Sequence, residues 1–76
     1  MDEWIVTNPE VLGGKPCVRG TRISVELILE LLASGASRED ILGRYPQIGE
    51  TGWAAALSYA ARAMKNEVVW DISIPA

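Results

Sequence analysis

Helix caps and helix breakers divide the middle of the chain into three short segments, and this division constrains the fold more than any other feature. Ser24 is a favourable N-cap, and the apolar residues after it recur at the spacing of one helix face until Ser34–Gly35. Ser37 can cap a second helix, with Asp40 in the acidic position of a capping box. That helix must end before Pro46, because proline disfavours the helical conformation of the preceding residue.

The last segment predicts a longer helix over residues 50–65. Its apolar stripe consists of Trp53, Ala56, Leu57, Ala60 and Met64. Gly52 lies in the first turn, where glycine costs about 1 kcal/mol relative to alanine, so we expect an irregular start. Residues 24–65 are therefore predicted to form a three-helix unit of the helix-turn-helix kind.

The first 23 residues predict a small β element. Trp4–Val6 is a short apolar run that is typical of a strand, and Asn8–Pro9 is typical of the turn after it. Cys17–Arg19 and Arg22–Ile23 flank Gly20–Thr21 with the spacing of a hairpin that has a two-residue loop. We expect a β-hairpin at this place.

The tail, residues 66–76, alternates in the way expected of a strand that ends at Pro75. Val68 begins the strand, and Trp70, Ile72 and Ile74 share one of its faces. The fold class is therefore mainly α, with a small N-terminal β-hairpin and a short C-terminal strand. All 76 residues form one domain in this interpretation.

Size and charge limit the function classes. A chain of 76 residues buries a small core and commonly gains stability by association, so we expect a homodimer or a higher homo-oligomer. A net charge of −3 means that DNA could be bound only through a local basic patch. The chain has neither a signal-peptide pattern nor an apolar run of about 20 residues, and we expect a cytoplasmic protein.

Residues that carry chemistry are few. The chain has no histidine, which excludes a Ser-His-Asp triad and a Cys/His zinc site. Cys17 stands in an apolar stretch and is expected to be a buried, inert thiol. Gly13–Lys15 is no phosphate-binding loop, because Pro16 lacks the backbone N–H that would bind phosphate. We expect no catalytic residue, no cofactor and no metal.

A cluster of cations, Lys15, Arg19 and Arg22, is the best candidate for a binding site. Arginine suits bidentate binding of phosphate, but these side chains could equally pair with Glu26, Glu30 or the acidic N-terminus. Further candidates lie on the predicted helices. The full set of candidate DNA-binding residues is Lys15, Arg19, Arg22, Arg38 and Arg62.

Four motifs in combination resemble a known family. Asn8–Pro9 precedes the segment 13–23, Gly-Gly-Lys-Pro-Cys-Val-Arg-Gly-Thr-Arg-Ile. An acidic helix closing in Tyr-Pro follows at 41–46, and Ala-Ala-Leu-Ser-Tyr-Ala stands at 55–60. Over residues 5–62 the chain resembles the small prokaryotic family catalogued as domain of unknown function 433 (DUF433).

The resemblance implies a homeodomain-like three-helix fold and the role of an antitoxin, similar to the VapB antitoxins, in a type II toxin–antitoxin pair. It also implies a PIN-like ribonuclease toxin as partner and an operator DNA that the dimer represses. Val68, Trp70, Ile72 and Ile74 are then the candidate toxin-binding residues. Their strand could instead pair within the chain or a homodimer. A stand-alone helix-turn-helix regulator, or a homo-oligomeric interaction domain that binds no DNA, remain the alternative functions.

Overall fold

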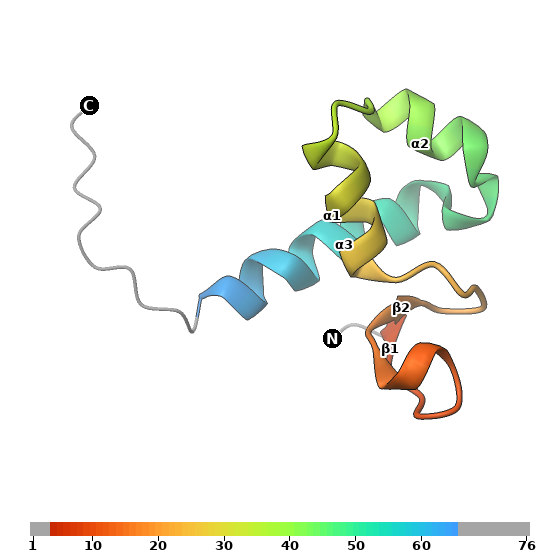
Figure 1. Ribbon diagram of the computed structural model, residues 1–76, viewed down its shortest axis with the longest axis vertical. Helices are drawn as coiled ribbons and strands as arrows, with labels where there is room; N and C mark the ends of the chain where they lie inside the picture. Colours follow the sequence, from red (N-terminus) through yellow and green to blue (C-terminus); the bar gives the residue numbers. More distant parts are fainter. Residues whose placement is uncertain (1–3, 66–76) are drawn as a thin grey trace.

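The computed structural model describes residues 4–65, which form a mainly helical unit with a small two-stranded antiparallel sheet (Figure 1). Its elements in chain order are β1 (Ile5–Val6), the 3-10 turn η1 (Leu12–Gly14), β2 (Cys17–Val18), α1 (Val25–Ala33), α2 (Arg38–Arg44), the 3-10 turn η2 (Pro46–Ile48) and α3 (Gly49–Met64). The predicted C-terminal strand, with Val68, Trp70, Ile72 and Ile74, lies outside the described residues.

The caps predicted for α1 and α2 are confirmed. The Ser24 hydroxyl accepts a hydrogen bond of 2.9 Å from the backbone N–H of Leu27. In α2 the Ser37 hydroxyl accepts from the N–H of Asp40, and the Asp40 carboxylate accepts from the N–H of Ser37, both at 3.0 Å. Each helix therefore begins where a side chain satisfies a backbone N–H that lacks a partner within the helix.

The capping box makes the stability of α2 dependent on pH. The Ser37 backbone N–H, and then the Ser37 side chain, hold the pKa of the Asp40 carboxyl below its usual range. Because the folded-state pKa is depressed, this stabilisation is present above the unfolded-state pKa of about 4 and is lost as pH falls through the folded value. We expect Asp40→Asn to flatten the fall in unfolding free energy below about pH 5, as measured by urea denaturation.

The control for this change is Glu39→Gln, which removes a carboxylate from the same turn and leaves the capping box intact. An acid-induced loss of stability that is the same in Asp40→Asn and the wild type would contradict the assignment.

The start of α3 differs from the expectation. No irregular turn is present at Gly52, which lies inside the regular helix and is buried. A Cβ atom on Gly52 would lie 2.9 Å from Cγ1 of Val18, so the absence of a side chain allows the helix to pack closely on β2. The change of direction between η2 and α3 is made at Gly49, whose φ is 66°.

The hairpin predicted around Gly20–Thr21 is present as an antiparallel bridge, but its loop is longer than the predicted two residues. β2 pairs with β1 in the register Ile5–Val18 and Val6–Cys17. It also pairs with its own continuation through an antiparallel bridge between Cys17 and Ser24, and the N–H of Val18 donates to the carbonyl of Ile23 at 3.0 Å across a turn of four residues, 19–22. In this turn the N–H of Thr21 donates to the carbonyl of Val18 at 3.0 Å. The Thr21 hydroxyl also donates to that carbonyl and accepts from the N–H of Ile23, at 2.8 and 2.9 Å. The Thr21 side chain thus adds two hydrogen bonds that stabilise the turn of this hairpin.

The core lies where α3 crosses α1 and the sheet (Figure 1). Its buried apolar side chains come from both strands, the segment before α1, the three α-helices and η2: Ile5, Cys17, Val18, Ile23, Val25, Ile28, Ile41, Ile48, Trp53 and Ala56. Cys17 is 2% exposed, which confirms its expected burial, and its thiol donates to the carbonyl of Lys15 at 3.2 Å. Among residues 4–65, no helix is long and apolar enough to cross a membrane.

Candidate interaction surfaces

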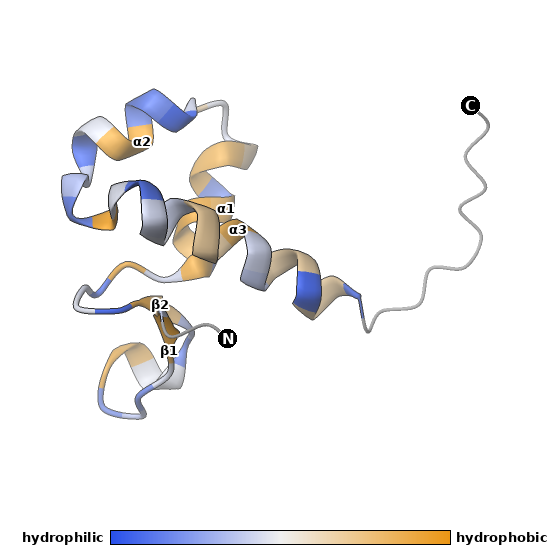
Figure 2. Cartoon of the chain, turned by 180° about the vertical axis from the view of Figure 1, so that it is seen from behind, coloured by the Kyte–Doolittle hydropathy of each residue, from blue (hydrophilic) through white to orange (hydrophobic). Residues whose placement is uncertain are grey.

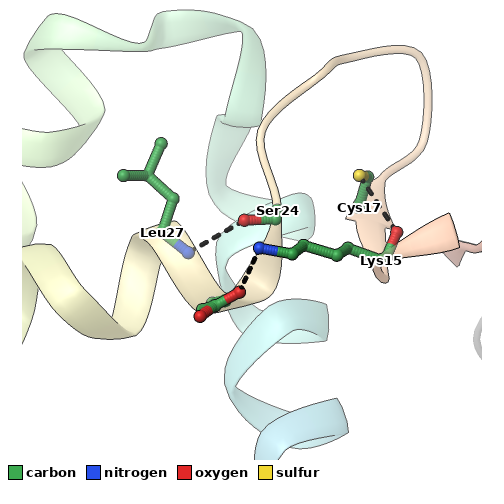
Figure 3. Close-up of polar contacts among 5 residues, drawn as sticks. Lys15, Cys17, Ser24 and Leu27 are labelled. Carbon is green, nitrogen blue, oxygen red and sulfur yellow. Dashed lines mark hydrogen bonds and ion pairs between the residues drawn. The ribbon is translucent and has the colours of Figure 1, made fainter. Parts of the chain in front are cut away.

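Lys15 is held by an ion pair within the chain. Its Nζ lies 2.7 Å from Oε1 of Glu26, so the Gly-Gly-Lys-Pro loop is tied to the first turn of α1 (Figure 3). This hydrogen bond, and then the negative charge of Glu26, raise the pKa of the Lys15 amine. Lys15 could have contacted a phosphate or formed an ion pair within the chain, and the structure contains the ion pair.

Arg19 and Arg22 have different surroundings. The Arg19 guanidinium lies over the ring of Trp4, 5.8 Å from its centre, in a cation–π contact. Arg22 makes no hydrogen bond or ion pair within residues 4–65. Because the turn is longer than predicted, these two arginines do not flank a two-residue loop.

Arg22 borders a groove between the η1 loop and α1, which we call the α1 groove. The groove has a volume of about 370 Å³. It is lined by Leu12, Lys15, Arg22, Ser24, Glu26, Leu27 and Glu30. Two cations and two carboxylates give the lining no net formal charge, so a ligand of one sign is not favoured.

From the sequence, Leu12 was not predicted to line this groove. Leu12 has a φ of 51°, an uncommon conformation for a leucine, and its side chain is 41% exposed. The glycine pair that follows has positive φ values of 65° and 89°. The sequence signal was present, since two adjacent glycines permit a left-handed turn, but it does not reveal that the residue before them adopts the same conformation.

Arg38 and Arg62, the other two predicted DNA-binding residues, do not join the cluster of Lys15, Arg19 and Arg22. Arg38 forms an ion pair of 3.0 Å with Glu50 and a longer one of 3.8 Å with Glu39, which ties α2 to the first turn of α3. Arg62 donates to the hydroxyl of Ser58 at 3.1 Å and lies twelve residues after Glu50, or about 18 Å along the helix axis. The five predicted DNA-binding residues therefore do not form one patch.

A second surface is the C-terminal end of α3. The apolar stripe of this helix is buried at Trp53 and Ala56 and half-buried at Ala60, but Met64 is 58% exposed. Residues 61–65 are all exposed, because the helix extends past α1 and the sheet at this end (Figures 1 and 2). The stripe was predicted from the sequence, whereas its uncovered end was not.

Within the part of the chain that the structure describes, no group of three or more Cys, Asp or Glu side chains could hold a metal ion. Several charged side chains of residues 4–65 instead form surface ion pairs or line the α1 groove. The groove and the exposed end of α3 are the two surfaces that we consider for function; a smaller pocket of about 170 Å³ lies between Val6, Val11 and Thr21.

In a comparison with known protein families, residues 5–60 match the family described as a protein of unknown function (DUF433). The uncharacterized protein y4eO of Sinorhizobium fredii (strain NBRC 101917 / NGR234) is 36% identical over 58 residues, which are 76% of this chain and 26% of that protein. The crystal structure of a DUF433 member from Anabaena variabilis ATCC 29413 is similar with a TM-score of 0.77 and 29% identity. That match covers 82% of this chain and 61% of the Anabaena chain. This chain thus spans about a quarter of the curated relative.

Proposed function

This chain belongs to the DUF433 family, and we propose that it is a non-catalytic binding protein, the antitoxin of a type II toxin–antitoxin pair. In this role it binds a PIN-like ribonuclease directly and holds it inactive. The observation that carries the proposal is the uncovered apolar end of α3, centred on Met64.

An amphipathic helix that extends beyond its own domain suits a recognition mode in which the apolar face lies in a groove of the partner. The half-buried Leu57 and Ala60 and the exposed Met64 supply the i, i+3 and i+7 positions of such a face. Val68 and Trp70, two of the proposed toxin-binding residues, follow in the sequence within six residues of Met64. A toxin bound to α3 would therefore meet these residues next along the chain.

A second candidate function is repression of its own operon as a homeodomain-like DNA-binding protein. The four residues between α2 and α3 favour it, because a short turn between two helices is typical of helix-turn-helix units. The charges at the start of α3 are less favourable for DNA binding. Glu50 stands in the first turn of α3, where base contacts are usually made, and it holds Arg38 in an ion pair. Neutralisation of a partner protein is the better supported role.

The test uses the product of the adjacent reading frame, expressed alone and together with the full chain. We expect it to arrest growth as a ribonuclease and the chain to relieve the arrest. Met64→Glu should weaken binding of the isolated toxin by about tenfold or more, because it places a charge in an apolar contact. The matched control, Ser58→Glu, adds the same charge on the exposed face and keeps a partner for Arg62.

Circular dichroism should show both variants folded, since Met64 and Ser58 are exposed. A non-toxic neighbour, or a toxin that binds Met64→Glu as tightly as the wild type, would contradict the proposal. The same proteins titrated with the operon's promoter DNA test the second candidate, whose affinity must fall steeply with salt.

A further inference from the structure

We propose that the α1 groove is the contact surface for a second copy of this chain, which docks through its own α1 groove about a two-fold axis. This inference does not depend on the antitoxin role, because it concerns the residues around Glu30 rather than the end of α3. Such an interface would give a dimer in which each copy contributes the same surface.

The charges of the groove complement themselves. Lys15 and Glu26 neutralise each other across a distance of 2.7 Å. Arg22 and Glu30 line the same groove, yet neither forms an ion pair within residues 4–65, although the charge of Glu30 acts on Lys15. A surface that presents a cation without an ion-pair partner and a carboxylate that interacts with Lys15 only at longer range matches a copy of itself, since each charge of one copy can meet its opposite in the other.

Helix geometry permits this match. Leu27 stands three residues from both Ser24 and Glu30, which is about 4.5 Å along the axis in either direction. If two α1 helices lie antiparallel with the two-fold axis at Leu27, Glu30 of each copy is level with Ser24 of the other. Arg22 comes two residues before Ser24, and its long side chain can then reach this carboxylate.

Apolar side chains beside these charges would supply the contact area. Leu12 is exposed at the groove in a strained left-handed conformation, which suggests a role other than packing in the monomer. Leu27, which lines the groove, is half-buried and adds to this area. Apart from its two glutamates the residues of α1 are apolar, and Leu31 and Leu32 are likewise only half-buried among the described residues. The helix therefore has apolar area left for a partner to cover.

Charge reversal tests this pairing. The wild type should sediment as a dimer rather than as a species of 8.3 kDa. Arg22→Glu places like charges opposite each other in a homodimer, and so does Glu30→Arg, so each should weaken dimerisation by at least about tenfold. A one-to-one mixture of the two variants should form a heterodimer, because every reversed charge then meets its opposite.

The control is Arg44→Glu, which makes the same charge change on α2, outside the groove, and should leave the dimer intact. Three results would overturn the proposal: a monomeric wild type, a dimer that resists both reversals, or variants that fail to associate when mixed. The last would also follow if Arg22 and Glu30 pair within one chain. In that case the double variant Arg22→Glu with Glu30→Arg would recover thermal stability without restoring a dimer.

Discussion

Replacing Ile28 with alanine is expected to lower the free energy of unfolding by about 2–5 kcal/mol, the largest effect we predict for a single substitution. The Ile28 side chain is 0% exposed and belongs to the core that α1 shares with α3 and the sheet. A domain of this size has a total stability of roughly 4–11 kcal/mol, so the loss would remove a large share of it. Urea denaturation followed by circular dichroism measures the change.

Leu29→Ala is the matched control, because it removes a side chain of equal size from the next position of the same helix. Leu29 is 39% exposed, and we expect its loss to cost less than about 1 kcal/mol. Both variants should be measured at low protein concentration, where association contributes little to stability. Equal losses from the two substitutions would mean that α1 presents a different face to α3.

Gly52→Ala and Gly43→Ala are expected to change stability in opposite directions. Alanine has the higher helix propensity at both positions, by about 0.5–1 kcal/mol. At Gly43 of α2 a new Cβ meets no atom within 4 Å, and the variant should gain this stability. At Gly52 the Cβ would lie 2.9 Å from Val18 and 3.4 Å from Ile48, both buried and branched, so we expect a net loss of about 1–2 kcal/mol.

Thermal and urea unfolding of the two glycine variants give the sign directly. A gain of stability in Gly52→Ala would show that α3 can move away from β2 at little cost. A further substitution then distinguishes the causes: Val18→Ala in the Gly52→Ala background removes the opposing methyl groups. If crowding is the cause, the two changes together should cost less than the sum of their separate effects.

Features that depend on neighbouring residues were correct from the sequence. Ser24 and the pair Ser37 and Asp40 cap their helices as predicted, because a cap joins groups only three residues apart. Pro46 ends α2 for an equally local reason. The motifs around residues 13–23 also identified the family, since a combination of unusual residues at set spacings is itself a property of the sequence.

The candidate interaction surfaces could be predicted only in part from the sequence. The cations were found, yet the sequence left open whether Lys15 would pair with Glu26 or contact a phosphate. It offered no means of pairing Arg38 with Glu50, which lie on different helices. The predicted toxin-binding residues from Val68 onward lie outside the described part of the chain and stay a prediction.

What the sequence determined by itself is where each helix begins and ends and which residues form its apolar stripe, because these depend on dihedral preferences and on contacts within one or two turns. The tertiary structure decided that β2 pairs with Ile5–Val6 in addition to its own continuation, that α3 packs closely on Val18 at Gly52, and that within residues 4–65 the stripe of α3 is left exposed at Met64. Each of these joins or separates groups far apart in the chain. Their distances follow from how the elements pack, which no local pattern records.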